Sequence, residues 1–291
     1  MQSNKSEHVA MITGANSGIG LELARKLLAK GWQVIALNRS EVPTEDVELQ
    51  KVISSEQLRI YKVADLTDYD SLRLALQKLH NNEPYIDVIF NNAGQSFPEL
   101  TYSRQGRETH YELMTVVPYI ILMELKDLLL KGRLKTVINT SSSALNMRKS
   151  FNLELLERPQ KFRKVVGPYA ASKLALSLWT EAIAPSLANE GILIRSVDPG
   201  VNNTVRKGQK SGLPIWMKSF MRFSSPPTHG AGLLFDSAVG EHRSKTGVFL
   251  IKGKIQSLPF RESAPQLLKR LEEIYRQQFK QEARIEANAR A

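Results

Sequence analysis

The sequence predicts an α/β fold built on a doubly wound sheet of about seven parallel strands, with helices on both faces. Two observations carry this prediction. Short apolar runs alternate with amphipathic stretches along the chain, and these runs are apolar throughout, as in strands that are buried on both faces. Neither an internal repeat nor a linker divides the chain, so we expect all 291 residues to form a single domain.

The apolar runs predict the strands, and the helical recurrence of apolar residues predicts the helices. We expect strands at residues 9–13, 33–37, 60–63, 86–90, 136–139, 192–197 and 247–251. In the first helix, Ile19, Leu23 and Leu27 recur with the helical period before Gly31 closes it. We expect helices at residues 19–30, 69–82, 107–130, 169–189 and 228–238.

Glycines or polar residues directly follow six of the predicted strands. They are found at residues 14–20, 38–39, 65–66, 91–94, 141–143 and 198–200. Ligands of open parallel sheets bind at the carboxyl ends of the strands. The sequence therefore predicts a ligand site where these six strand ends converge.

The segment Thr13-Gly-Ala-Asn-Ser-Gly-Ile-Gly20 lies between the first strand and the first helix. Its glycines allow a tight turn and a close approach of the backbone to a pyrophosphate, and the helix N-terminus offers free N–H groups to that anion. Glycines placed at random in a loop are the alternative. The position between strand and helix favours dinucleotide binding.

The end of the second strand bears on the choice of dinucleotide. An acidic residue there would bind the adenosine 2′-hydroxyl and favour NAD, but the chain reads Ala36-Leu-Asn-Arg-Ser40. Arg39 could pair with a 2′-phosphate, so NADP is preferred and NAD is the less favoured cofactor. An exposed loop arginine without a ligand is the alternative interpretation.

Tyr169 and Lys173 are the candidate catalytic pair. Four helical residues advance about 6 Å, so both side chains lie on one helix face, one turn apart. A free tyrosine has a pKa of about 10, and lowering it to about 7 requires about 4 kcal/mol in favour of the phenolate. A neighbouring cation and the helix N-terminus both act in that direction.

Taken together, these motifs resemble the short-chain dehydrogenase/reductase family over roughly residues 8–258. The resemblance rests on the order of five motifs: Gly14–Gly20, Asn91–Gly94, Ser142, Tyr169 with Lys173, and Pro199-Gly200. It implies a Rossmann-like sheet, a nicotinamide cofactor and reversible hydride transfer between a carbonyl and an alcohol. The 26 residues between Ser142 and Tyr169 are similar to those of retinol-dehydrogenase-like and protochlorophyllide-reductase-like members, which tend to act on bulky apolar substrates.

The same resemblance implies the catalytic roles. Tyr169 would be the general acid in reduction and the base in oxidation, and Lys173 would lower its pKa and bind the nicotinamide ribose. Ser142 would bind the substrate carbonyl, with Ser141 and Ser143 as the off-by-one alternatives. Thr115 falls where the family often has an asparagine that holds a water of the proton relay, which puts the relay in doubt.

The cofactor-binding residues are also carried over from the family motifs. The pyrophosphate would contact the glycine turn, the adenosine the ends of strands three and four, and the nicotinamide the end of strand six. The expected set is Gly14, Ser17, Gly18, Ile19, Gly20, Arg39, Asp65, Leu66, Asn92, Ala93, Gly94, Tyr169, Lys173, Pro199, Gly200, Val201 and Thr204.

Two segments of the last third carry further expectations. Residues 205–226 contain an apolar stretch interleaved with Lys218 and Arg222, which predicts a substrate lid that could touch a membrane surface. A short helix packed on the core is the alternative. Residues 264–291 predict a basic amphipathic helix that could dock on the domain or mediate self-association into a homo-oligomer, with a frayed end.

Composition excludes several classes of protein. The chain has no cysteine, so disulfides and thiolate chemistry are excluded, and its five histidines are scattered without metal-site spacing. We therefore expect no metal and take the histidines as isolated surface or core residues. No apolar run is long enough to span a membrane, and the polar N-terminus lacks a signal-peptide core, which predicts a cytoplasmic protein.

The net charge of +11 is concentrated near the C-terminus, where residues 203–291 hold 16 Lys and Arg against 7 Asp and Glu. Such a region attracts phosphates or anionic lipid, although a solvated basic face is an equal alternative. No nucleic-acid recognition motif accompanies it, so no nucleic acid is expected as a partner.

Two functional hypotheses follow. The leading one is an NADP(H)-dependent oxidoreductase acting on a small-molecule carbonyl or alcohol of apolar character. The other is a dinucleotide-binding regulatory protein with weak or no catalysis, which Thr115 and the basic C-terminal third keep open.

Overall fold

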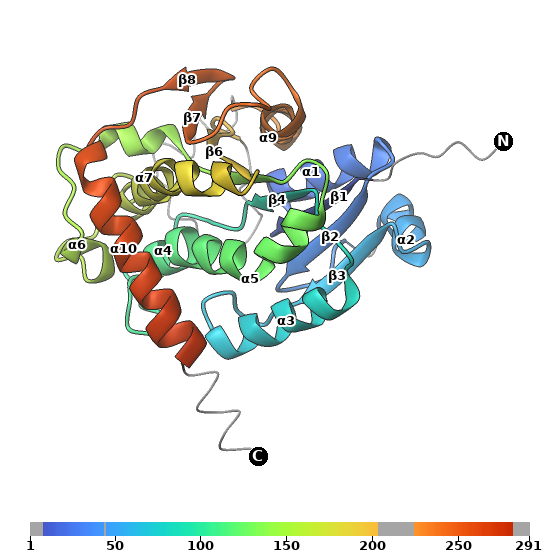
Figure 1. The fold of residues 1–291 in the computed structure, drawn as a ribbon, viewed down its shortest axis with the longest axis horizontal. Coiled ribbons are helices and arrows are strands. Elements are labelled where there is room, and N and C mark those ends of the chain that lie inside the picture. The colour runs from blue at the N-terminus through green and yellow to red at the C-terminus, as the bar shows by residue number, and fades with distance from the viewer. Residues whose placement is uncertain (1–7, 44, 203–223, 282–291) are drawn as a thin grey trace, which may run out of the picture.

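A computed structural model describes residues 8–43, 45–202 and 224–281. Its centre is an eight-stranded sheet of order β3-β2-β1-β4-β5-β6-β7-β8 (Figure 1). The strands are β1 (Val9–Thr13), β2 (Gln33–Asn38), β3 (Leu58–Lys62), β4 (Val88–Asn91), β5 (Thr136–Thr140), β6 (Leu193–Asp198), β7 (Val248–Ile251) and β8 (Lys254–Gln256). The first seven run parallel, as predicted, and β8 pairs antiparallel with β7 in a hairpin that the sequence did not predict.

The two faces of the sheet bury separate apolar cores, which follows from the alternation of side chains along each strand. In β1, Val9 and Met11 pack on one side, whereas Ala10 and Ile12 pack on the other. Because both sets are buried, β1 carries an uninterrupted apolar run from Val9 to Ile12. The expectation of a sheet covered on both faces is confirmed.

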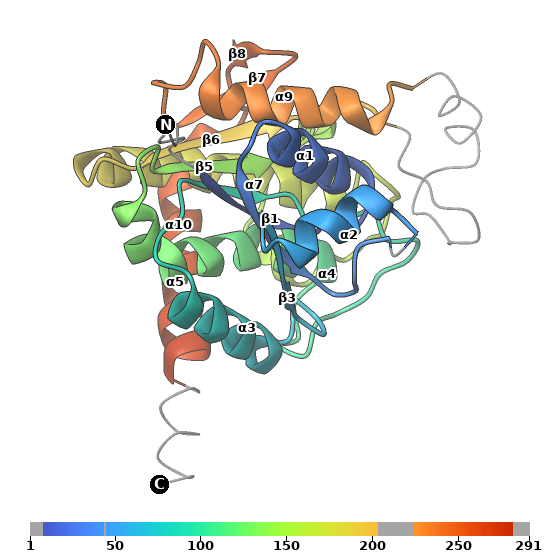
Figure 2. The ribbon, with the colours of Figure 1, turned by 90° about the vertical axis from the view of Figure 1, so that its right-hand side faces the viewer.

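Helices form the two outer layers (Figures 1 and 2). One core lies under α3 (Tyr69–Asn82), α5 (Val117–Lys131), α7 (Pro168–Asn189) and α10 (Ala264–Ile274). The other lies under α1 (Gly18–Ala29), α2 (Val47–Ser54) and α9 (Pro227–Val239). Helices α1 and α9 lie side by side on that face (Figure 2).

The predicted helix 107–130 is interrupted in the structure. A short helix α4 (Thr109–Tyr111) leads into a π-helical turn, Glu112–Val116, before α5 begins at Val117. The extra residue per turn shifts the backbone register where this segment passes the strand ends. Hydrophobic periodicity continues through the turn, which is why the sequence indicated one uninterrupted helix.

The C-terminal helix docks on the domain across the helices of one face (Figure 1). Leu267, Leu271 and Ile274 of α10 are buried, and so is Phe279 in the π-helical continuation Tyr275–Lys280. Of the two expectations for residues 264–291, docking is therefore confirmed for residues 264–281. The rest of that segment, and the proposed lid apart from residues 224–226, lie outside the described residues.

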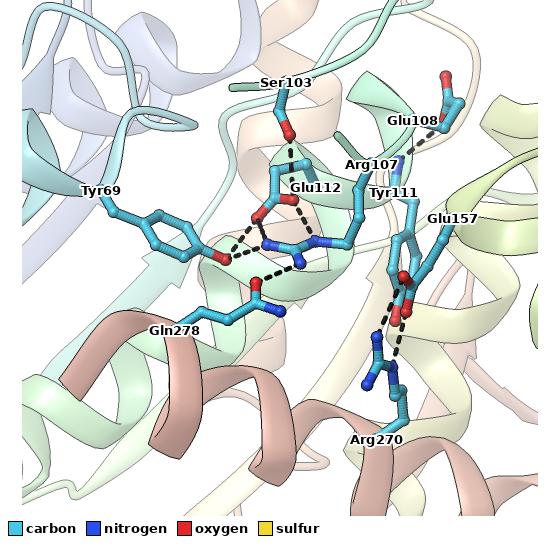
Figure 3. Close-up of polar contacts among 9 residues, drawn as sticks. All are labelled: Tyr69, Ser103, Arg107, Glu108, Tyr111, Glu112, Glu157, Arg270 and Gln278. Carbon is cyan, nitrogen blue, oxygen red and sulfur yellow. Dashed lines mark hydrogen bonds and ion pairs between the residues drawn. The ribbon is translucent and has the colours of Figure 1, made fainter. Parts of the chain in front are cut away.

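A buried ion pair joins this C-terminal segment to the domain (Figure 3). The Arg107 guanidinium donates to the Glu112 carboxylate at 2.5 Å and also to the Gln278 side chain, while the Tyr69 hydroxyl donates to Glu112 at 2.7 Å. Both charged side chains are almost fully buried, so the charge of each is compensated by the other.

Among the described helices, none combines the length and the apolar character needed to cross a membrane.

We expect Arg107→Met to lower the free energy of unfolding by about 3 kcal/mol, because it leaves the Glu112 carboxylate buried without a countercharge. The double variant with Glu112→Gln should recover part of this loss. Urea denaturation measures both. Lys51→Met, which breaks the exposed pair with Glu48, is the control and should cost less than about 1 kcal/mol. Equal losses of unfolding free energy in Arg107→Met and Lys51→Met would contradict the role given to the buried pair.

Candidate active site

The glycine turn between β1 and α1 is shaped by its contacts. Gly14 adopts φ +71° and Gly18 φ +55°, which are left-handed conformations that glycine reaches without strain. A Cβ on Gly20 would lie 2.1 Å from the Gly14 carbonyl oxygen and 2.5 Å from Nδ2 of Asn92. Only glycine fits at Gly20, so the turn closes tightly at the N-terminus of α1.

The end of β4 packs directly against this turn. The backbone N–H groups of Asn92 and Ala93 both donate to Oγ1 of Thr13 at 2.9 Å. A Cβ on Gly14 would meet Cα of Ala93 at 3.2 Å, and one on Gly94 would meet Nζ of Lys173 at 3.6 Å. Two predicted motifs, the glycine turn and Asn91–Gly94, are thus brought together beside Lys173.

The ends of β2 and β3 border the same edge. Asn38 is buried and its Oδ1 accepts from the Ala15 N–H at 2.7 Å, which ties β2 to the glycine turn. The next residue, Arg39, is exposed. After β3, the exposed Asp65 accepts from the Thr67 backbone and hydroxyl, and the adjacent Leu66 is half-buried.

Ser142, Tyr169 and Lys173 meet at the ends of β5 and α7. Ser142 lies two residues after β5, and its hydroxyl is near enough to the Tyr169 phenol, in the first turn of α7, to lower the pKa of that phenol. Lys173 lies one turn further along and is 5% exposed, and its Nζ donates to the Thr140 carbonyl at 2.6 Å. The structure therefore assembles the three side chains that the sequence singled out.

A seam of buried polar contacts fixes α7 against β5. The Ser141 hydroxyl lies 2.7 Å from the Ser177 hydroxyl, and Nδ2 of Asn139 donates to Oγ1 of Thr180 at 2.8 Å. Together with the bond from Lys173 to Thr140, these contacts set the register of the helix along the strand. The Ser141 hydroxyl is hydrogen-bonded within this seam, whereas the Ser142 hydroxyl lies near Tyr169.

Burial dominates the protonation of the two titratable groups. It lowers the pKa of the Lys173 ammonium to about 7, and the nearby Asp198 carboxylate opposes this. Burial also raises the pKa of the Tyr169 phenol, the hydrogen bond from Ser142 lowers it, and Asp198 raises it again. In the protein alone, the Tyr169 phenol is therefore held in its neutral, proton-donating form.

Thr115 lies in the π-helical turn and is fully buried. Its hydroxyl donates to the Ser172 carbonyl of α7 at 2.9 Å. The preceding residue, Met114, is the one that reaches Gly94, with Sδ 2.8 Å from where a Cβ would stand. Thr115 could hold a water only through its oxygen lone pairs, because its hydrogen is engaged by the backbone.

The end of β6 forms the remaining border of the site. Pro199 is buried, Gly200 adopts φ +78° with its N–H donating to the Asp198 carboxylate at 3.0 Å, and Val201 is 64% exposed. The predicted Thr204 lies outside the described residues. Asp198 was passed over as a site residue, although its place directly before Pro199-Gly200 was visible in the sequence.

His110 was also missed. The sequence showed it without metal-site spacing, but the structure buries it against the Tyr169 ring, with ring centroids 6.0 Å apart. An acidic residue two positions earlier, Glu108, was the signal that could have marked it.

The residues present fit a dinucleotide. Gly14 and Gly18 adopt left-handed conformations and Gly20 leaves no room for a Cβ, so the backbone turns tightly into the N-terminus of a twelve-residue helix, whose free N–H groups suit a pyrophosphate. Ser142 follows β5, two strands along from β1, and Tyr169 and Lys173 lie in the first turns of α7 beside it. This arrangement places a proton-transfer group beside an anion-binding turn, which is what hydride chemistry with a nicotinamide cofactor requires.

Comparisons with known proteins agree with this chemistry. A family model described as short chain dehydrogenase matches residues 8–153. Human retinol dehydrogenase 11 is 29% identical over 237 residues, covering 80% of this chain and 73% of its own length. Retinol dehydrogenase 12 of Bos taurus is 31% identical over 240 residues, with the same coverage.

A solved structure supports the fold. The NADPH-bound carbonyl reductase from chicken fatty liver superposes with a TM-score of 0.64 at 22% sequence identity, covering 86% of this chain and 99% of its own. At this identity the likeness concerns the fold, which is a Rossmann fold. On the family match and the similarity to retinol dehydrogenases, the chain belongs to the short-chain dehydrogenase family of oxidoreductases, in its retinol-dehydrogenase-like subgroup.

Proposed function

We propose that this protein is an NADP(H)-dependent oxidoreductase that transfers a hydride between nicotinamide and the carbonyl or alcohol group of an apolar small molecule. One observation carries the proposal: the Ser142 hydroxyl lies near the Tyr169 phenol, and the buried Lys173, one turn along α7, lies beside Gly94, which packs next to the glycine turn. Fold alone would not support a specific reaction, but this set of side chains has a role for each member.

The mechanism assigns one task to each side chain. When bound, the nicotinamide supplies or accepts the hydride. Tyr169 donates its phenolic proton to the carbonyl oxygen in reduction and takes it back in oxidation. Ser142 holds the same oxygen by a hydrogen bond that strengthens as negative charge develops there. A protonated Lys173 stabilises the phenolate that Tyr169 becomes, and Thr115 would hold a relay water.

The preference for NADP rests on the end of β2. Asn38 is turned inward to the glycine turn, so it is Arg39, exposed at the rim, that could meet a 2′-phosphate. Its planar guanidinium suits bidentate binding of a phosphate. The NADPH bound to the structurally similar carbonyl reductase is consistent with this preference.

The preference for an apolar substrate rests on the relatives and on the site's surroundings. The similar proteins are named for retinol, an alcohol on a long apolar chain. Phe97 and Phe162 stand close to His110, which itself packs on Tyr169. The basic and apolar composition of residues 205–226 would suit a peripheral membrane contact.

The proposal is tested by NADPH oxidation with all-trans-retinal and decanal as apolar aldehydes and xylose as a polar one. Turnover should favour the apolar aldehydes. Tyr169→Phe should lower kcat about 1000-fold and Ser142→Ala about 100-fold, because each removes a group that acts on the reacting oxygen.

Tyr102→Phe is the matched control, since it removes the hydroxyl of an exposed tyrosine, and it should leave kcat unchanged. If wild type and Tyr169→Phe were equally inactive on every aldehyde while NADPH still bound, the protein would instead be a dinucleotide-binding regulator.

Arg39→Ala should weaken NADPH binding about 10-fold and leave NADH binding unchanged, because a charge-assisted hydrogen bond to the 2′-phosphate is lost. Titration of the quenching of tryptophan fluorescence by each dinucleotide measures the two Kd values. Arg104→Ala removes another exposed arginine and serves as the control. A wild type that binds NADH more tightly than NADPH would refute the assignment.

Burial of Lys173 should appear as a pH dependence of stability. Its pKa is lowered to about 7 in the folded protein, from an ordinary value of 10.5. Between these pH values the unfolded chain holds more protons on this group, so the free energy of unfolding rises with pH across that window. Relative to Lys173→Met, the wild type should therefore gain stability from pH 7 to pH 10.

Urea denaturation at a series of pH values measures this difference. Lys78→Met, which removes an exposed lysine, should give a curve parallel to that of the wild type. A difference between wild type and Lys173→Met that does not change with pH would show that burial leaves the ammonium unperturbed.

A further inference from the structure

The hydrogen bonds around His110 fix the orientation of its ring. The Phe97 backbone N–H donates to Nε2 of His110 at 2.9 Å, so Nε2 must carry its lone pair. The proton is then on Nδ1, which lies 2.6 Å from a Glu108 carboxylate oxygen. The second Glu108 oxygen accepts from the Tyr111 backbone N–H at 2.9 Å (Figure 3). Both side chains are 1% exposed, so the His110 ring is fixed by bonds that are shielded from solvent.

This imidazole is the centre of a ring cluster that includes Tyr169. The His110 and Tyr169 rings are nearly perpendicular, at 84°, with centroids 6.0 Å apart. Phe97 packs edge-on against His110 at 4.8 Å, and Phe162 lies at 6.4 Å. Edge-to-face pairs at these distances are attractive, so the phenol ring has a preferred position against His110.

The cluster joins three separate parts of the chain. Phe97 comes from the segment after β4, Phe162 from the segment before α7, and Tyr169 from α7 itself. The Glu108 backbone N–H adds a bond to the Glu157 carbonyl at 2.9 Å, in the segment that precedes α7. His110 and Glu108 therefore fix the two segments on either side of the Tyr169 ring.

We infer that His110, oriented by Glu108, is a positioning residue for Tyr169: it fixes the phenol ring in the place where its hydroxyl meets Ser142. The inference rests on the proposed function for its meaning in catalysis. Phe97 and Phe162, both half-buried, are held by the same imidazole and form an apolar wall for the substrate beside the reacting hydroxyl.

The test compares His110→Phe with wild type in NADPH oxidation by all-trans-retinal. Phenylalanine keeps a flat ring but makes neither hydrogen bond, so the ring is no longer oriented. We expect kcat to fall about 10-fold or more, because a small misplacement of a catalytic group costs rate steeply. The Kd for NADPH should stay unchanged, since His110 is not among the residues expected to bind the dinucleotide. His80→Phe, which removes an exposed histidine 2.7 Å from Asp127, is the matched control and should leave kcat unchanged.

A second readout needs no turnover. The ultraviolet absorbance of tyrosinate is followed against pH with NADP⁺ present. Subtracting the curve of the matching Tyr169→Phe protein leaves the titration of the Tyr169 phenol, which gives its pKa. Because the Ser142 hydroxyl lowers this pKa, a phenol displaced from Ser142 should titrate at a higher pH in His110→Phe than in the wild type. Glu108→Gln keeps the His110 ring and serves as a second variant. It should shift the pKa of the Tyr169 phenol in the same direction.

The outcomes separate the inference from the proposed function. Loss of activity in Tyr169→Phe together with wild-type kcat and an unchanged phenol pKa in His110→Phe would overturn the inference alone. Wild-type activity in Tyr169→Phe would overturn the proposed function, and the tyrosinate titration would still decide whether His110 positions the ring. If kcat of His110→Phe fell only in proportion to the fraction of folded protein, and the pKa of the Tyr169 phenol did not change, the positioning role of His110 would be contradicted.

Discussion

The chemistry of the site depends on the seam that holds α7 against β5. Ser142 comes from the end of the strand, and Tyr169 and Lys173 come from the helix, so their meeting requires the two elements to keep one register. Buried hydrogen bonds between the strand and the side chains of Lys173, Ser177 and Thr180 on the helix provide it. Apolar packing alone would allow the helix to slide, whereas a buried polar group that loses its partner costs about 1–3 kcal/mol.

The same arrangement places function and stability in opposition. A lysine buried at the carboxyl end of the sheet is costly in its charged form, which is the form that assists the tyrosine. The Asp198 carboxylate reduces that cost by favouring the ammonium, but it also disfavours the phenolate. The glycine turn and the Ser142 hydroxyl act at the same edge, so the balance of charge there is set jointly by the ends of β1, β5 and β6 and by Lys173 of α7.

A second buried network supports the first from the other side of the site. The Arg107–Glu112 pair anchors the π-helical turn and the C-terminal segment, and Glu108 with His110 anchors the segments around Tyr169. The Arg107–Glu112 pair and the Glu108–His110 pair both lie within residues 107–112, which come after β4 in the chain. This short stretch therefore links the docking of the C-terminal helix to the surroundings of the phenol.

The sequence by itself determined the parallel sheet and the candidate site at its carboxyl edge. Apolar runs, the glycine spacing of the first turn and the Tyr169–Lys173 interval are local patterns, and their physical meaning depends only on neighbouring residues. Tertiary structure decided what depends on distant partners: the β7–β8 hairpin, the π-helical turn, the seam between β5 and α7, and the place of His110 against Tyr169. The sequence does not show which buried group a histidine or a threonine will contact. These contacts form only when segments that are far apart in the chain pack together.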